Sequence, residues 1–380
     1  MNFGLYEHER QFLDTVDRLM ARHMPAQEVR RRDAAHQDCS DLRPIFGDAG
    51  LLALPFPAAY GGLEQNKLTV GLVHERLSYH ASIAGAIFGM SVDFGGMSIM
   101  AYGTEAQKKH LLPPLIRGEL GFSLALTESG AGSDAAAVVT SARKTSAGWV
   151  ISGRKTWISN AGSSDYLITL CRTTPGSKGK EGLSVFLIPR NSRGVNMTQL
   201  EKVGNNCMSS WDIGLDDVEV GHDAIMGEEG DGLRNMLTTM QYSRVGHAAM
   251  SIGCAQAACD AAARYVADRR QFGRRIADFQ VIRHRLVDMQ MRVDQARLLL
   301  YRACWMIDEG LPARKETAQA KIAASEALER VTNHGMHMCA SMAYSAESDM
   351  QRYWRDARLY TFGEGTNELQ RDLIAKEMGL

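Results

Sequence analysis

Residues 124–134 read Leu124-Ala125-Leu126-Thr127-Glu128-Ser129-Gly130-Ala131-Gly132-Ser133-Asp134, an apolar strand followed by a loop of small side chains. Glycines let backbone N–H groups approach a ligand closely, and hydroxyl side chains add donors, so the loop suits a phosphate or the edge of a flavin. It matches neither the P-loop pattern nor the dinucleotide-binding fingerprint, which argues against a kinase and against a Rossmann fold. A Gly/Ser loop is also a common surface turn, and this segment alone leaves both interpretations open.

A second segment, about twenty residues further on, contains a tryptophan among polar residues: Gly153-Arg154-Lys155-Thr156-Trp157-Ile158-Ser159-Asn160-Ala161. The indole face can form one wall of a site for a planar cofactor, with the Ser159 hydroxyl in reach of a ring heteroatom. A half-buried core tryptophan explains the same pattern equally well.

Along the whole chain, the pattern of hydrophobic residues changes twice. Residues 1 to about 120 have a helical pattern, broken at Leu54-Pro55-Phe56-Pro57 and at Tyr60-Gly61-Gly62. From about 121 to 225, strand patterns such as 149–152, 166–170 and 183–188 are separated by Gly, Ser and Pro. Long helical periods return from about 230. The predicted order is therefore helices, a small β domain and a helical bundle.

The clearest predicted helix lies within residues 281–308, where apolar residues form one stripe and the other faces are polar. The stripe forms either a subunit interface or the core of an intramolecular bundle. Its members recur at alternating spacings of four and three: Ile282, Leu286, Met289, Val293, Ala296, Leu300, Ala303 and Ile307.

The composition is that of a soluble globular protein, and 380 residues are enough for two or three domains. The 43 basic and 44 acidic side chains leave a formal net charge of −1, which argues against binding of nucleic acid. There is no apolar run of eighteen residues, no secretory or transit pattern after Met1, and no Cys-x-x-Cys pair among the seven cysteines. We expect a cytoplasmic protein without a membrane span, a disulfide framework or a metal site.

In this order and spacing, the two segments resemble the FAD-dependent acyl-CoA dehydrogenase family, and the resemblance covers essentially the whole chain. It implies an α+β fold that is mostly α, with an N-terminal helical domain (1–120), a middle β-barrel domain (121–226) and a C-terminal four-helix bundle (227–380). The other landmarks are Tyr60-Gly61-Gly62, Tyr102-Gly103-Thr104-Glu105, Asp268-Arg269-Arg270-Gln271-Phe272-Gly273, Arg355-Asp356-Ala357 and Glu364-Gly365-Thr366-Asn367-Glu368.

The resemblance also implies which residues bind FAD. The flavin and its ribityl and phosphate groups are expected at Leu124, Ala125, Leu126, Thr127, Gly132 and Ser133, of which Ser133 also faces the substrate. The flavin ring is expected under Trp157, Ile158 and Ser159. The FAD of a neighbouring subunit is expected at Arg269, Gln271 and Phe272, with Gln280 close by, so the protein should be a homo-oligomer, a dimer or a tetramer. The cofactor set is completed by Thr366, Glu368, His337 and Ser341.

Dehydrogenation beside a thioester needs a base for the α-proton and polarisation of the carbonyl, while the flavin accepts the hydride. By resemblance Glu364 is the base, and its backbone N–H forms an oxyanion hole with a flavin ribityl hydroxyl. Gly363 and Gly365 free the backbone to bend, and Gly365 leaves room for the substrate. Exclusion of water should raise the pKa of the carboxyl. The alternative is a loop glutamate that stabilises the N-terminus of the next helix.

A minority branch of the family instead places the base on a C-terminal helix, immediately before an arginine. That position is Ser243 here, before Arg244, and a serine cannot act as the base. Arg244 matches a family residue near the acyl-thioester site, and a structural ion pair is the alternative for it.

The chain departs from the family in one segment. At the adenosine half of FAD the family usually has Gln-x-x-Gly-Gly-x-Gly, and this chain has His337-Met338-Cys339-Ala340-Ser341-Met342-Ala343. Each added Cβ narrows the approach of a phosphate to the backbone, so we expect weaker retention of FAD. His337 stands where the glutamine usually donates, and an ordinary helical histidine is the alternative.

The preferred function is oxidation of an acyl-CoA, or of an acyl group on a carrier protein, to the 2,3-enoyl thioester, with an electron-transferring flavoprotein as electron acceptor. A second function is that of an oxygen-using flavoprotein, related to acyl-CoA oxidases or monooxygenases. A third is a non-enzymatic relative that binds a partner.

Overall fold

The computed structural model describes residues 4–380, and its N-terminal part is helical as predicted. The Pro-rich and Gly-rich breaks give only short turns, η1 (Leu51–Ala53) and η2 (Ala58–Tyr60). The side chains of Asn66 and Thr104 accept backbone N–H groups and so begin two of the helices. The helices are α1 (Glu7–His23), α2 (Ala26–Ala34), α3 (Leu42–Asp48), α4 (Lys67–His80), α5 (Ser82–Gly89), α6 (Met97–Tyr102) and α7 (Glu105–Ile116).

Helix α5, the π-helical segment η3 (Met90–Gly96) and α6 form one continuous apolar stretch. Its length and composition would allow a membrane span, but 83% of its apolar window is buried inside the protein. Gly96 packs directly on the Phe56 ring, where a Cβ would come within 2.1 Å of the ring atom Cζ. Burial in the core therefore accounts for the apolar composition of this stretch.

The middle part is one eight-stranded sheet, and it is not the closed barrel that we expected. Its strands are β1 (Phe122–Ala125), β2 (Ser141–Lys144), β3 (Trp149–Ser159), β4 (Tyr166–Arg172), β5 (Leu183–Pro189), β6 (Val195–Leu200), β7 (Ser210–Val220) and β8 (Ile225–Met226). They follow the order β6-β7-β3-β2-β4-β5-β8, with β1 parallel to β4. Within residues 4–380 no ladder joins β6 to β8, the two ends of this order, and the sheet therefore stays open.

The strands predicted at 149–152, 166–170 and 183–188 are confirmed as β3, β4 and β5. Trp149 and Phe186 meet edge to face in the core of the sheet domain, with ring centroids 5.2 Å apart. Strand β1 also contacts η3 of the N-terminal part. The Gly/Ser loop that follows β1 therefore starts where the sheet meets the helices.

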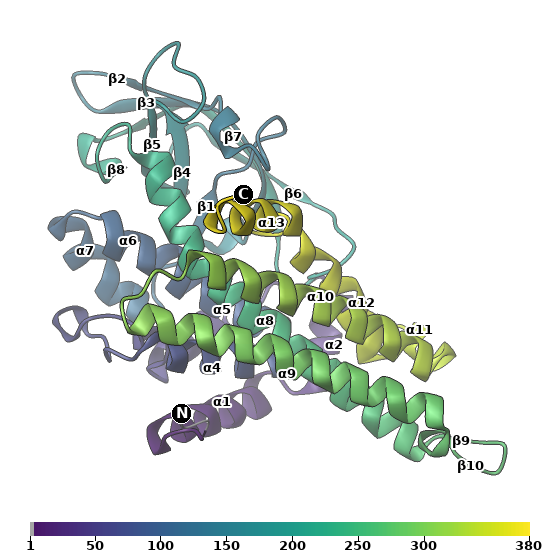
Figure 1. The fold of residues 1–380 in the computed structure, drawn as a ribbon. Helices are drawn as coiled ribbons and strands as arrows, with labels where there is room; N and C mark the ends of the chain where they lie inside the picture. Colours follow the sequence, from purple (N-terminus) through teal and green to yellow (C-terminus); the bar gives the residue numbers. More distant parts are fainter. Residues whose placement is uncertain (1–3) are drawn as a thin grey trace.

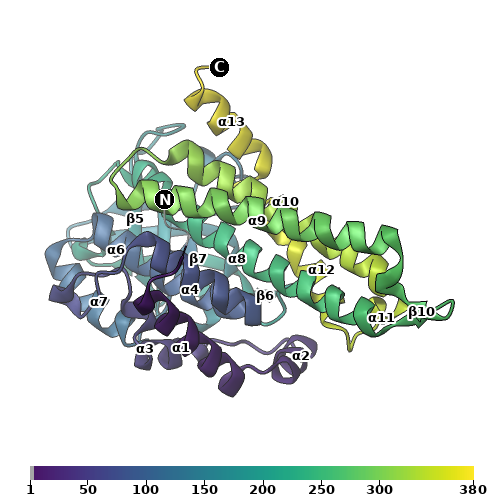
Figure 2. The same cartoon turned by 60° about the horizontal axis from the view of Figure 1, so that its bottom comes forward.

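The C-terminal part is a helical bundle. Helices α8 (Gly232–Asp268), α9 (Gln280–Asp308) and α10 (Arg314–Cys339) run side by side, and α12 (Asp349–Ala357) packs on α8 and α10 (Figures 1 and 2). A hairpin of β9 (Arg270–Gln271) and β10 (Arg274–Arg275) projects from one end of the bundle. The chain ends with α11 (Ser341–Tyr344), η8 (Arg358–Thr361) and α13 (Asn367–Glu377).

Helix α9 confirms the helix predicted within 281–308. Its apolar stripe, represented by Met289, Val293 and Leu300, is buried in the core of the bundle, so this stripe is an intramolecular contact. The expectation that the other faces are polar is wrong, because a second set of large apolar residues points outward. This outer face consists of Val287, Met291, Leu298 and Trp305, each more than half exposed.

Candidate active site

Glu364 lies in the short loop between η8 and α13, and two successive residues there have left-handed backbone conformations. Glu364 has φ 56° and Gly365 has φ 87°, and the first is uncommon for any residue with a side chain. Helix α13 is capped by Thr366, whose hydroxyl accepts the backbone N–H of Leu369 at 3.3 Å. The capping alternative for Glu364 is therefore not what the structure shows.

The Glu364 carboxyl is mostly removed from water, with 17% of its side chain exposed. Ser243 Oγ donates a hydrogen bond to Glu364 Oε2 at 2.5 Å. Burial raises the pKa of Glu364 to about 7, although the Ser243 hydrogen bond acts in the opposite direction. The negative charge of Asp93 also raises this pKa, whereas the positive charges of Arg244 and Lys321 lower it. A carboxyl with a pKa near neutrality can both take and return a proton.

Lys321 on α10 fixes the loop that carries Glu364. Its buried ammonium donates to the carbonyls of Gly365 at 3.0 Å and Thr361 at 3.3 Å, and to Asn367 Oδ1 at 2.8 Å. Burial lowers the pKa of Lys321 to about 8, while the charge of Glu364 raises it. Sequence reasoning missed this residue. The available signal was one lysine in the small-residue run 317–325, because a buried ammonium needs partners.

Arg244 follows Ser243 on α8 and is 6% exposed. Within residues 4–380 it makes neither an ion pair nor a hydrogen bond, and its Nε is buried without a partner. Burial lowers the pKa of Arg244, and the charge of Glu364 raises it. The structural ion pair considered for Arg244 is thus not seen. A buried guanidinium that lacks a partner is suited to an acceptor atom of a bound molecule.

The two segments that resemble a flavin site lie against each other. The backbone N–H of Thr156 donates to the Thr127 carbonyl at 2.9 Å. Lys155, which is fully buried, donates to Glu128 Oε1 at 2.8 Å and to the Leu126 carbonyl at 3.2 Å. These bonds hold residues 126–128 against β3, so the small-residue loop starts from a rigid support.

Trp157 stands out of the sheet at an irregularity in the β3–β7 pairing, between Lys155 and Ile158. It has φ 59° and its side chain is 56% exposed, whereas the neighbouring Ile158 is 2% exposed. The alternative of a half-buried core tryptophan is therefore wrong. Ser159, the third residue expected under the flavin, is half-buried.

The first segment is open enough for a flavin. A Cβ placed on Gly130 or on Gly132 would meet nothing within 4 Å, so the backbone of the loop can be approached closely. Ser133 is exposed beside these glycines, and Thr127 is half-buried. Leu124, Ala125 and Leu126 lead into the loop at the end of β1. Within residues 4–380 the backbone N–H groups of Gly130 and Gly132 have no acceptor, and an open loop with such donors fits FAD.

Segment η3 links β1 to the catalytic candidate. Gly95 packs on the Phe122 ring at the start of β1, where a Cβ would lie 2.9 Å from a ring atom. In the same segment Asp93 is buried and pairs with Lys67 at 3.0 Å. The charge of Asp93 is one of those that raise the pKa of Glu364, so η3 contributes both to the packing of β1 and to the surroundings of this carboxyl.

The residues that we expect to bind the FAD of a neighbouring subunit lie far from the 127–133 loop of their own chain. Arg269, Gln271, Phe272 and Gln280 are all exposed at or beside the β9–β10 hairpin, and Phe272 is 93% exposed. The hairpin lies at the end of the bundle that is remote from the sheet (Figures 1 and 2). The chain by itself does not bring them to the 127–133 loop.

The segment 337–343, which departs from the family pattern, keeps a backbone conformation typical of glycine at Ala340. His337 is exposed in the last turn of α10, and Ser341 is exposed at the start of α11. Between them Ala340 has φ 51° and ψ −134°, a conformation that glycine adopts freely and alanine only with strain. Ala340 stands where the family's first glycine is expected, so the backbone conformation is retained without the residue that favours it.

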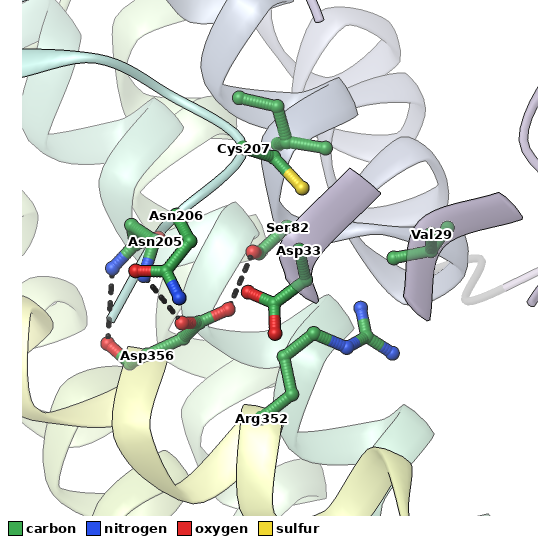
Figure 3. Close-up of a pocket in the computed structure, with 9 residues that line it drawn as sticks. Val29, Asp33, Ser82, Asn205, Asn206, Cys207, Arg352 and Asp356 are labelled. Atoms are coloured by element: carbon green, nitrogen blue, oxygen red, sulfur yellow. Dashed lines mark hydrogen bonds between the residues drawn. The ribbon is translucent and has the colours of Figure 1, made fainter. Parts of the chain in front are cut away.

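The Arg355-Asp356-Ala357 segment connects the C-terminal part of the chain to the other two parts. Asp356 accepts the backbone N–H of Asn205 at 2.6 Å and the Ser82 hydroxyl at 3.2 Å, so one carboxylate joins all three parts of the chain (Figure 3). Arg355 donates to Asp33 at 2.5 Å beside it. The cavity between these groups measures about 10 Å³, roughly the space of one water molecule, and is too small for a substrate.

Glu368 and Thr366, the remaining expected cofactor residues, sit at the start of α13. The Glu368 side chain is 82% exposed. Within residues 4–380 no group of three or more His, Cys, Asp or Glu side chains is arranged to hold a metal ion.

Family models match all three parts of the chain: acyl-CoA dehydrogenase, N-terminal domain, over residues 6–119; middle domain, over 123–218; and C-terminal domain, over 230–379. The chain belongs to the acyl-CoA dehydrogenase family, whose members are FAD-dependent flavoproteins. It is an oxidoreductase with helical N-terminal and C-terminal parts around a sheet domain.

Three relatives in sequence are informative. The probable acyl-CoA dehydrogenase YngJ of Bacillus subtilis is 34% identical over 96% of this chain and 98% of its own length. The glutaryl-CoA dehydrogenase of Desulfococcus multivorans is 36% identical over 88% of this chain and 86% of its own. The caffeyl-CoA reductase-Etf complex subunit CarC of Acetobacterium woodii is 33% identical over 92% and 91%.

Two solved structures are similar over nearly the whole fold. Butyryl-CoA dehydrogenase from Megasphaera elsdenii superimposes with a TM-score of 0.96 at 30% identity, covering 100% of both chains. The prolyl acyl carrier protein oxidase AnaB gives a TM-score of 0.94 at 28% identity, over 99% of this chain and 100% of that one.

Proposed function

We propose that this protein oxidises an acyl-CoA to the 2,3-enoyl-CoA, with Glu364 as the base that takes the α-proton. The observation that carries the proposal is the buried Glu364 carboxyl, whose pKa is raised to about 7. It does not cap a helix, and it lies near a buried arginine without a partner. The acyl-CoA dehydrogenases among the relatives support the same reaction.

In the proposed abstraction of the α-proton, the groups around Glu364 have separate roles. Oε2 accepts the Ser243 hydrogen bond, and Oε1, which accepts no hydrogen bond within residues 4–380, is the oxygen to which we assign the proton. Within residues 4–380 the backbone N–H of Glu364 has no hydrogen-bond acceptor, and it can therefore donate to the thioester oxygen as negative charge develops there. Gly365 leaves space beside it, and Arg244, whose charge acts on Glu364, is proposed to contact the substrate.

FAD, when bound, supplies the hydride acceptor for the β-carbon. In the proposal, the loop from Leu124 to Ser133 holds its flavin and ribityl portion, and Trp157, Ile158 and Ser159 cover the ring. Ser133 also contacts the substrate, and Thr366 and Glu368 complete this half of the site. The remaining residues serve the FAD of a neighbouring copy: Arg269, Gln271, Phe272, Gln280, His337 and Ser341.

A homo-oligomer, a dimer or a tetramer, is part of the proposal. Two observations support it: the outer face of α9 is apolar, and Phe272 is 93% exposed on a projecting hairpin. We propose an electron-transferring flavoprotein as the electron acceptor, since one relative is a subunit of a reductase-Etf complex. Seven buried free thiols support the cytoplasm as compartment. The domains are proposed as 1–120, 121–226 and 227–380.

The deciding experiment mixes the holoprotein anaerobically with a panel of acyl thioesters and follows flavin absorbance. At least one acyl-CoA should bleach the flavin in the wild type. Glu364→Gln keeps the size of the side chain but removes the base, so the bleaching rate should fall on the order of a thousandfold. If no acyl-CoA or carrier-bound acyl group bleaches the flavin, the proposed function is wrong.

A second candidate is an oxidase that acts on a carrier-bound acyl group, which the similarity to AnaB favours. The same panel separates the two. Stoichiometric hydrogen peroxide in air, with carrier-bound substrates preferred over CoA thioesters, would select the oxidase.

A further inference from the structure

His247 on α8 is buried directly beside the catalytic candidate. Its Nε2 lies 3.1 Å from the Tyr360 carbonyl oxygen. A carbonyl can only accept, so Nε2 carries the hydrogen. Burial lowers the pKa of His247 to about 3, so the ring is neutral. Its Nδ1 is therefore an acceptor with a lone pair.

That lone pair faces Glu364. His247 Nδ1 lies 3.8 Å from Glu364 Oε1, the carboxyl oxygen that Ser243 does not occupy. The Tyr360 ring fixes the imidazole from one side, with ring centroids 4.8 Å apart. Gly363 makes room on another side, since a Cβ there would lie 3.2 Å from His247 Cε1. The contact is thus built by both α8 and the loop.

Only one of the two protonation states of Glu364 can donate a hydrogen bond to Nδ1. An ionised carboxylate has only lone pairs and cannot bond to Nδ1. A protonated carboxyl has one O–H, which a small rotation brings within hydrogen-bond reach of Nδ1. Protonated Glu364 is the form that exists after the α C–H bond has broken and the new O–H bond has formed at Oε1.

We propose that His247 is a positioning residue that accepts the hydrogen bond of protonated Glu364 and so stabilises the base after it has taken the substrate proton. This inference rests on the proposed function. The proton stays between Glu364 and His247 Nδ1, and the ring keeps its own hydrogen at Nε2. Ser243 anchors one carboxyl oxygen throughout the cycle, and His247 engages the other only in the protonated state.

Other charged groups face Glu364 from each packed element. Arg244 on α8 and Lys321 on α10 favour the ionised form. Asp93 on η3 favours the protonated form, and it lies 3.6 Å from the His74 ring of α4. None of these groups offers a neutral acceptor to Oε1. Replacing His247 therefore tests a contribution that the charges do not duplicate.

The test titrates the Glu364 carboxyl in holoprotein without substrate, by infrared difference spectroscopy against Glu364→Gln. In His247→Leu the acceptor is gone, so the apparent pKa should fall, with a protonation constant about tenfold weaker. His247→Gln places an amide oxygen nearby and should restore much of the wild-type value. His334→Gln, a partly buried histidine elsewhere in the bundle, is the matched control and should change nothing.

The outcomes are separable from those of the acyl-thioester panel, because the titration needs no turnover. An unchanged titration in His247→Leu would overturn the proposal, whether or not any substrate bleaches the flavin. If His247→Leu does not fold, His247→Gln decides alone. Its amide oxygen should keep the pKa of Glu364 close to the wild-type value, and a tenfold weaker protonation constant in His247→Gln would contradict a role for the acceptor. With an active substrate, the pH profile of flavin reduction should shift in the same direction as the titration.

Discussion

Ser243 Oγ donates a hydrogen bond to Glu364 Oε2 at 2.5 Å, across 121 residues of sequence. By the family resemblance, Ser243 stands at the position where a minority of the family carries its base, and Glu364 stands at the position used by the majority. In this chain the two positions are in contact. A serine that cannot act as a base thus orients the glutamate that we propose as the base.

Ser243→Ala removes a hydrogen bond that favours the ionised carboxyl, so the pKa of Glu364 should rise further above its present value near 7. Because only the ionised form takes a proton, the rate of flavin reduction at neutral pH should fall roughly tenfold and recover in part at higher pH. Stopped-flow pH profiles check this. A rate loss that is the same at every pH would instead mean that Ser243 acts only on geometry. Thr238→Ala, on an exposed face of α8, is the control.

Wild-type activity should rise with pH through a midpoint near 7, because the base must be ionised before it takes a proton. The contribution of Glu364 to folding stability should instead fall as pH rises. The folded-state pKa lies above the ordinary value of 4.5, so the folded protein binds this proton more tightly than the unfolded chain does. That stabilisation is complete below about pH 4.5 and is lost as pH rises through 7.

Glu364→Gln should therefore leave stability little changed near pH 5 and raise it near pH 8, by about 3 kcal/mol at most. Urea unfolding at the two pH values measures the difference. Glu368→Gln, with a side chain that is 82% exposed, should show no such pH dependence. Equal effects of Glu364→Gln at both pH values would contradict a raised pKa.

Lys321→Met should loosen the loop that carries Glu364. It leaves the carbonyls of Gly365 and Thr361 and the Asn367 side chain without their buried donor. We expect a loss of about 3 kcal/mol in unfolding free energy and a larger loss in kcat than in KM. Thermal melts and steady-state kinetics measure both. Lys376→Met, an exposed lysine on α13, should leave both unchanged.

Ala340→Gly should relieve backbone strain, since Ala340 has φ 51°. We expect a gain of about 1 kcal/mol in stability and slower loss of FAD on dilution and gel filtration. Ala343→Gly, inside the short helix α11, should instead destabilise by about 1 kcal/mol. FAD that stays fully bound to the wild type through gel filtration would show that the 337–343 segment does not weaken retention.

The order of the three parts and most of their elements could be predicted from the sequence. Hydrophobic period and Gly/Pro breaks are local properties, and they gave β4, β5 and α9 to within two residues, but only the first four residues of β3. The expected cofactor loop and the Trp157 segment were also local patterns, and the structure joins them through the Thr156 to Thr127 hydrogen bond. The closed barrel was not recoverable in this way, because closure depends on whether two edge strands meet.

The sequence by itself determined the family and singled out Glu364, because its glycine neighbours and the flavin-type segments are short motifs read along the chain. Only the tertiary structure decided which groups surround that carboxyl. Ser243, His247 and Lys321 come from two long helices, and each looks ordinary in its own segment. A carboxyl's pKa depends on burial and on charges a few ångströms away, and those distances exist only after the helices have packed.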